Sequence, residues 1–456
     1  MAYMRPFRSE LRTLRSTAIW GLALAFAWPA AAGADAWLTT AGDAGLGTVG
    51  EAVASTLSAG LELRARELSL AVFGRVRLVI DESRDEPGGV RRRDYDEVAD
   101  YVHLLRTLRY ERRIEGVEAR LLAGELVGVT LGHGTLLREY SNVADPDHLH
   151  TGVRVQFEGE RVELDALIDN VLAPAVLAGR VAWRPWSAAP ALAVGASVAF
   201  DPRAPRRALV APGGARLYDA AYHPRVETAL LPLTGVDISY ALGDGGLVRV
   251  VPYVDGNTSW RGLGGHFGAQ AQLALGASGV LLHALGEYCL AGGGYGPTLI
   301  DTFYDVTRYQ SGLAFGAASQ ATAAQRATVL EALAAEAYAG GGFTLQGGVE
   351  AGEHLTVQVG YREHPGPDRR RLWARVITNP LPPLTVGALV LLRGLGPGEG
   401  PVARAGVAVL AEARYQLGRY WYALGQYTRT WAVDAASGLF IPLQGFNLAL
   451  GTQWAS

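Results

Sequence analysis

The densest group of residues able to do chemistry lies between Gly132 and His150. Within it, Asp145, Asp147 and His148 stand close to His150, so that two carboxylates and two imidazoles fall in one short segment. Carboxylates are ligands for calcium, and imidazoles suit zinc or nickel. The spacing matches no recognised metal motif, and Asp-Pro-Asp is good turn chemistry. The sequence therefore favours a capped turn here, and we predict no metal and no cofactor.

The same segment contains a possible nucleophile and base. Ser141 follows His133 by eight residues, and a serine activated by a histidine is a common catalytic pair. A Gly-x-Ser-x-Gly elbow is missing, and the histidine precedes the serine within one loop. We therefore do not predict an enzyme.

A third set of charged residues is spread along the chain. Arginines and carboxylates recur in or beside alternating stretches, mostly on the parity opposite the apolar side chains. If these stretches cross a membrane, a charge facing lipid near the midplane costs roughly 2–4 kcal/mol, so the charges must point inward. The residues predicted to line a pore are Arg64, Arg66, Arg75, Arg77, Arg120, Arg154, Glu163, Asp165, Asp169, Arg362, Arg371 and Arg375.

Opposed rows of arginine and carboxylate would create a field across a water-filled pore and screen solutes by charge and size. The same side chains could instead form ion pairs that stiffen the wall, and both roles are compatible. Arg106 lies between Leu104 and Leu108 on the wrong parity. It either snorkels or marks an error in the predicted register.

The elements that would position these residues are strands. In residues 443–454, Phe446, Leu448, Leu450 and Trp454 share one parity, and polar or small residues occupy the other. Counting back through alternating short turns and long loops gives eighteen strands. They are expected near 68–81, 100–111, 117–128, 151–158, 161–169, 176–185, 190–200, 227–240, 247–255, 265–276, 279–290, 342–350, 354–363, 370–379, 384–393, 402–414, 419–430 and 443–454.

We therefore predict an all-β fold, a transmembrane antiparallel β-barrel of about 16–18 strands over residues 57–456, with short periplasmic turns and long extracellular loops. Residues 35–56 are expected to be an N-terminal periplasmic lead-in. Residues 292–341 are expected to be one long loop with an Ala-rich helix over 317–338. This helix would either narrow the lumen or lie over the loops. If residues 303–315 form a strand, the count changes, and sixteen is the alternative.

The N-terminus and the composition narrow the class of protein. Four arginines precede an apolar run and an Ala-rich segment, so residues 1–34 are predicted to be a secretory signal peptide. The rest of the chain has a net charge of −6, which argues against a nucleic-acid partner. The single cysteine, Cys289, permits no internal disulfide.

With its predicted signal peptide, alternating strands and closing aromatic strand, the chain resembles Gram-negative outer-membrane porin-like proteins. That family usually ends on an aromatic residue, whereas here Ala455 and Ser456 follow Trp454. The resemblance implies passive diffusion of small hydrophilic solutes, contact with outer-membrane lipid and a possible homo-oligomer. Two alternatives remain: a plugged barrel with a structural, adhesion or secretion-partner role, and a barrel enzyme or hydrophobic-substrate transporter.

Overall fold

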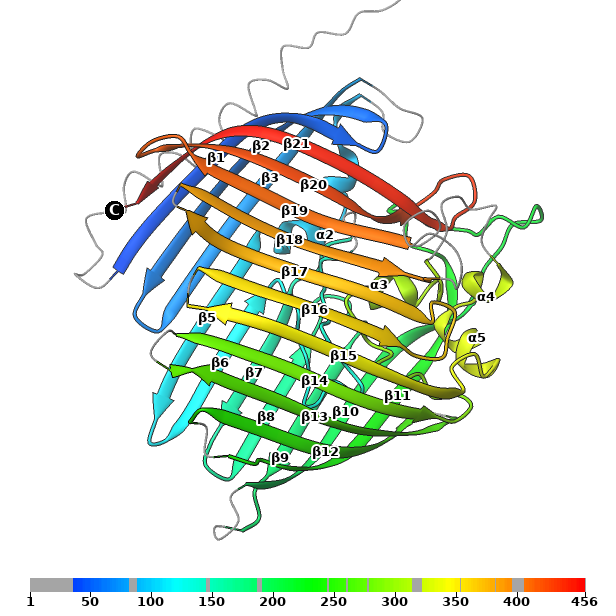
Figure 1. Ribbon diagram of the computed structural model, residues 1–456. Helices are drawn as coiled ribbons and strands as arrows, with labels where there is room; N and C mark the ends of the chain where they lie inside the picture. The colour runs from blue at the N-terminus through cyan, green and yellow to red at the C-terminus, as the bar shows by residue number, and fades with distance from the viewer. Residues whose placement is uncertain are drawn as a thin grey trace, which may run out of the picture.

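The computed structural model describes residues 36–81, 88–144, 148–186, 191–243, 246–259, 261–276, 279–313, 322–352, 354–381, 383–395 and 406–455. Over these residues the chain is a closed antiparallel β-barrel of 20 strands (Figure 1). Consecutive strands pair with one another around the barrel, and β1 pairs with β21 to close it. Closure leaves the sheet without an unpaired edge. The predicted signal peptide, residues 1–34, lies outside the described residues.

All eighteen predicted strands are present, with ends shifted by up to eight residues, the largest shift being at the end of the strand predicted over 190–200. The long strands are β1 (Ala36–Val49), β2 (Ala52–Ala65), β3 (Leu68–Asp81), β5 (Leu105–Ile114), β6 (Val117–Gly124), β7 (Gly152–Glu158), β8 (Val162–Ile168), β9 (Leu177–Trp183), β10 (Leu192–Ala208), β11 (Val226–Tyr240), β12 (Val248–Ser259), β13 (Leu263–Leu275), β14 (Val280–Ala291), β15 (Gly340–Ala351), β16 (Leu355–Glu363), β17 (Arg370–Leu381), β18 (Leu384–Arg393), β19 (Gly406–Gln416), β20 (Trp421–Val433) and β21 (Phe440–Ala455). A two-residue strand, β4 (Gly89–Val90), pairs with β3.

The predicted lead-in at 35–56 and the predicted start of the barrel at residue 57 are wrong. Strand β1 and the first part of β2 occupy this segment, so the barrel has two strands more than the eighteen predicted. Gly, Ala, Thr and Ser fill most of β1 and the beginning of β2. Their small side chains give almost no alternation in hydropathy, which is the signal that the other strands provide.

Connections alternate around the barrel. Turns of a few residues, such as Arg66–Glu67 between β2 and β3, lie at one end. The loops after β3, β6, β10 and β14 lie at the other end, with helices α3, α4 and α5 (Figure 1). The turn at 66–67 also separates two apolar patterns of opposite parity, Leu61 and Leu63 before it and Leu68 and Leu70 after it.

Helical structure is short and confined to the loops. The helices are η1 (Arg92–Asp94), α2 (Val98–Val102), α3 (Tyr304–Thr307), α4 (Ala323–Arg326) and α5 (Val329–Ala334). The single helix expected over 317–338 is therefore two short helices in its described part. Thr328 caps α5 through a capping box with Glu331 and so starts a new helix after Arg326. In the described part of the chain, no helix is long and apolar enough to span a membrane.

The outer surface of the barrel is apolar. In β21, Phe446, Leu448, Leu450 and Trp454 are exposed, while Ala449 between them is buried. Similar exposed apolar side chains recur on the other strands, for example Leu57 on β2. So much exposed apolar surface is unfavourable in water and favourable against lipid tails. The outer face is therefore that of a membrane-spanning barrel.

Arg106 faces the inside of the barrel because of a β-bulge. The register between β3 and β5 shifts between Ala71 and Val72, which leaves Arg106 without a directly paired residue. A bulge re-aims one side chain. The Arg106 guanidinium pairs with Glu125 and lies 5.1 Å from the centre of the Phe73 ring. The error lay in the predicted register, and the side chain does not snorkel.

Candidate functional site: the lumen and its constriction

Two loops pack together inside the barrel. We call residues 125–151, between β6 and β7, the inner loop, and residues 292–339, between β14 and β15, the long loop. Leu137 and Ile300 form a parallel bridge between them. These two residues and Tyr140 are fully buried in a hydrophobic cluster with inward side chains of the wall such as Leu231. The two loops therefore form one folded body within the lumen.

Buried polar side chains attach the inner loop to the wall. Thr135 donates a hydrogen bond to Asp255 on β12, with the oxygens 2.5 Å apart. Arg138 lies 2.8 Å from Glu287 on β14, and its side chain is 5% exposed. Tyr253 donates to the same Glu287 carboxylate oxygen at 2.6 Å. Because all these groups are buried, leaving any one unpaired would be costly.

Asn142 fixes the path of the inner loop. Its side-chain oxygen accepts from the Leu126 amide at 2.8 Å. Its side-chain nitrogen lies within hydrogen-bond distance of the carbonyls of Gly124, His150 and Asp169. One fully buried amide thus joins the start of the loop, its end and the neighbouring loop after β8. Sequence reasoning missed this role, because no local pattern links Asn142 to these distant carbonyls.

Wall arginines two to three strands further along the barrel attach the long loop. Asp301 pairs with both Arg362 on β16 and Arg371 on β17. Asp368 pairs with Arg393 at 2.9 Å and also accepts from the Leu313 amide at 3.1 Å. Each loop is therefore held by buried ion pairs to a different part of the wall.

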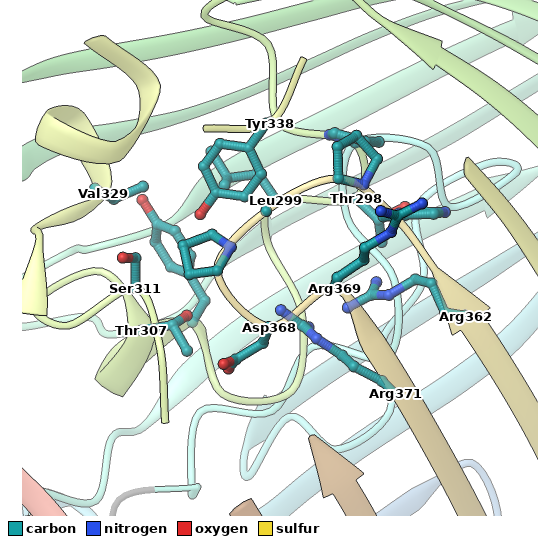
Figure 2. A pocket seen from close by; sticks show the side chains of 16 residues that line it. Thr298, Leu299, Thr307, Ser311, Val329, Tyr338, Arg362, Asp368, Arg369 and Arg371 are labelled. Carbon is teal, nitrogen blue, oxygen red and sulfur yellow. The ribbon is translucent and has the colours of Figure 1, made fainter. Parts of the chain in front are cut away.

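The space left by the loops is a series of adjoining cavities. One of about 30 Å³ lies at the loop end, and Figure 2 shows Arg362, Arg369 and Arg371 on one side of it, opposite Val329 and Tyr338. It shares Arg362 and Arg371 with a cavity of about 40 Å³, which is also lined by Arg138, Glu139, Asp301 and Trp373. We call the latter cavity the constriction.

Below the constriction the lumen widens. A cavity of about 530 Å³ shares Arg138, Glu139 and Trp373 with the constriction and extends past Arg375 and His283. A further cavity of about 330 Å³ adjoins it at Thr130, His133, Gln270 and Gln272. The four cavities therefore follow one another from the loop end towards the turn end of the barrel.

The charges on these walls are unbalanced. The four adjoining cavities are lined by nine arginines and six carboxylates, although the whole chain carries a net charge of −3. The arginines are Arg138, Arg154, Arg180, Arg184, Arg249, Arg362, Arg369, Arg371 and Arg375. The carboxylates are Glu139, Glu163, Asp165, Asp301, Glu350 and Asp368. The cavity walls therefore carry more arginines than carboxylates, although Glu287 and Asp237 pair with two of these arginines, Arg138 and Arg180.

The structure brings most of the predicted pore residues into the lumen but not into one site. Six lie on the four adjoining cavities: Arg154, Glu163, Asp165, Arg362, Arg371 and Arg375. Arg75 and Arg77 line a separate cavity between β1–β3 and β20–β21, where Arg77 pairs with Asp94. Arg120 pairs with Glu118 on the adjacent part of β6.

Three predicted residues lie elsewhere. Arg64 pairs with Glu62 close to the turn end of β2 and is largely exposed. Arg66 is in the turn itself, with a positive φ of 47°. Asp169 does not face a cavity wall: it is fully buried at the end of β8 and accepts from the amides of Ala175 and Val176. Strand parity alone could not separate wall positions from strand ends.

The His133 side chain packs against residues of the barrel wall. Its ring stacks on Tyr253 with centroids 4.0 Å apart, and its Nε2 lies 3.2 Å from Asp237. Among the described residues, no hydrogen bond joins His133 to Ser141. His148 stacks on His223, while Asp145 and Asp147 lie outside the described residues. The capped-turn interpretation of 145–147 and the absence of a catalytic pair stay predictions.

The fold and the lumen together define a membrane β-barrel with a narrow, charged, loop-lined interior. No family model and no curated protein match the chain. Solved structures of similar fold include *Pseudomonas aeruginosa* OpdL, with 13% identity, 92% of this chain and 98% of that chain covered, and a TM-score of 0.35. The outer membrane protein opdK of the same organism has 11% identity, coverage of 92% and 99%, and a TM-score of 0.34. Because the identities and TM-scores are this low, these similarities do not assign a function to the chain.

Proposed function

We propose that this protein is an outer-membrane channel that lets small hydrophilic solutes diffuse passively through its lumen. The observation that carries the proposal is the run of four adjoining cavities, each lined in part by charged side chains, inside a barrel with an apolar exterior. A water-filled path requires polar walls, and charged side chains line each of the four cavities.

The excess of arginine makes small anions the preferred solutes. At the constriction, Arg362 and Arg371 share the single carboxylate of Asp301, so their combined charge is only partly neutralised there. Glu139 also lines the constriction, and burial raises the pKa of this carboxyl, which weakens its negative charge. Arg375 then continues the positive wall below. Guanidinium groups bind carboxylate and phosphate oxygens in a fixed planar geometry.

The volume of the constriction limits what can pass. About 40 Å³ is open to the centre of a water-sized sphere, a few times the roughly 10–15 Å³ that one water molecule needs. The cavities on either side are about 30 Å³ and about 530 Å³. Conductance should therefore be small, and larger solutes need a movement of the inner or long loop.

Planar-bilayer recording of the purified, refolded protein tests the proposal. We expect reproducible single-channel steps, and a reversal potential in a KCl gradient that shows chloride more permeant than potassium. The variant Arg371→Gln should reduce that preference, while Arg64→Gln, in an exposed pair near the turn end, should leave it unchanged. A folded barrel that never conducts would overturn the channel, and cation preference would overturn the role of the arginines.

The other open interpretation is a plugged barrel with a structural, adhesion or secretion-partner role. The hydrophobic cluster formed by the inner and long loops favours it, since that cluster fills part of the lumen. The same recordings distinguish the two functions, because a plug would leave the folded wild-type barrel silent.

A further inference from the structure

Three loops meet at a buried group of side chains that the proposed channel does not use. His150 ends the inner loop, Asp169 follows β8, and Asp305 lies in α3 of the long loop. One potential ligand atom from each of these residues lies within 4.8 Å of the other two. Asp169 and Asp305 are 0% and 7% exposed. These three groups come from segments far apart in the sequence, so only the fold brings them together.

The two carboxylates lack a full set of compensating partners. Tyr140 is placed between them, with its hydroxyl oxygen 3.3 Å from Asp169 Oδ2 and 3.1 Å from Asp305 Oδ1. A single hydroxyl hydrogen can serve only one carboxylate at a time. The other Asp169 oxygen accepts the amides of Ala175 and Val176 at 3.0 and 2.9 Å. Two buried carboxylates with oxygens within 4.8 Å of each other repel unless a cation or a proton compensates their charge.

The histidine supplies a second, independent observation. His150 Nδ1 is buried and has no hydrogen-bond partner among the described residues. It lies 3.6 Å from Asp305 Oδ2, which is too far for a hydrogen bond. The His150 side chain is 16% exposed, and its Nδ1 lies close enough to both carboxylates to share one cation with them.

We propose that His150, Asp169 and Asp305 bind one divalent transition-metal cation, Zn²⁺, and that this ion ties the inner loop, the loop after β8 and the long loop together. One imidazole nitrogen with carboxylate oxygens is a ligand set that zinc uses. Calcium takes six to eight oxygen ligands, and this group offers too few. The Tyr140 hydroxyl lies beside both carboxylates and donates to one of them.

The electrostatics of the group agree with this assignment. A divalent cation would compensate both carboxylates at once. The ion would also link the loop that Asn142 organises to the helix that follows Asp301. It would therefore stabilise the loop arrangement around the constriction without lining the passage.

Zinc content and calorimetric titration of the full-length, EDTA-treated protein in detergent test the proposal. We expect one zinc ion per chain in the wild type and at least a tenfold weaker affinity in His150→Ala and Asp305→Asn. His148→Ala is the matched control, because it removes a histidine two residues away that instead stacks on His223. Absence of zinc binding in the wild type, or equal affinity in all variants, would overturn the site. Preference for Ca²⁺ or Mg²⁺ would overturn the choice of metal.

A measurement on the unmutated protein covers the case in which a variant does not fold. Carbethoxylation of each histidine by diethyl pyrocarbonate can be read by peptide mass spectrometry with and without Zn²⁺. Zinc should protect His150 at least several-fold and leave His148 unchanged. Equal modification of His150 under both conditions would refute the proposal. Neither experiment requires a conducting channel, so its result is independent of the proposed function.

Discussion

The substitution Arg138→Ala should release the inner loop from the wall. The Arg138 guanidinium donates to Glu287 at 2.8 Å and to the His133 carbonyl at 2.8 Å. Among the described residues, Arg138 is the arginine that pairs with Glu287. The glutamate is fully buried within the barrel wall. Removing the arginine would therefore leave a buried carboxylate facing a cavity in place of its partner.

The expected size follows from what remains around that carboxylate. Breaking a buried ion pair by removing one partner costs about 3–5 kcal/mol. Tyr253 still donates to Glu287 at 2.6 Å, and His266 Nδ1 is 3.3 Å away, so the lower end of this range applies. About 3 kcal/mol corresponds to a roughly hundredfold shift of the equilibrium between the seated and released loop.

Single-channel recording and thermal unfolding in detergent would measure the two consequences. Arg138→Ala should lower the free energy of unfolding by about 3 kcal/mol and increase conductance, because the inner loop no longer holds the constriction. Arg64→Ala removes an arginine from an exposed pair with Glu62, so it should change stability by less than about 1 kcal/mol. Adding Glu287→Gln to Arg138→Ala should recover most of the lost stability, because it removes the stranded charge.

Two results would refute this reasoning. Equal stability losses in Arg138→Ala and Arg64→Ala would show that burial does not determine how much an ion pair stabilises this protein. An unchanged conductance in an Arg138→Ala protein with clearly reduced stability would show that the inner loop does not control the passage.

Two further predictions test the barrel closure and its dependence on pH. Ala44 on β1 is paired with Leu450 on β21, so cysteines at these two positions should form a disulfide in the folded barrel. Cysteines at Ala44 and Leu448, two residues out of register, should not. Equal crosslinking of the two pairs on SDS gels would contradict closure of the barrel by β1. Burial, followed by the charge of Arg362, holds the pKa of His364 well below 6.5, so its stabilising contribution is complete above pH 6.5 and is lost as the pH falls below that value. The wild type should thus lose stability through His364 as the pH falls from 7.5 to 5.5, and His364→Gln should lose less; identical pH dependence of their melting curves would exclude this histidine as a cause.

The amino-acid sequence by itself determined most of the strand order. Alternation of apolar and polar residues has a period of two only in strands, and a one-residue error moves every side chain to the other face. The exposed Phe446, Leu448 and Leu450 on β21 are an example. The same signal was absent from β1, where small residues fill both faces, so the first two strands were missed.

Only the tertiary structure decided how the lumen is filled. Parity indicates that Arg362 and Arg371 point inward, but not that Asp301, about sixty residues earlier in the long loop, pairs with both of them. Nor does it indicate that the inner loop enters the barrel through Arg138. Local sequence patterns record which face of a strand is buried, whereas contacts between distant loops depend on barrel closure and on the pairing of buried charges. For the same reason the fold alone unites His150, Asp169 and Asp305.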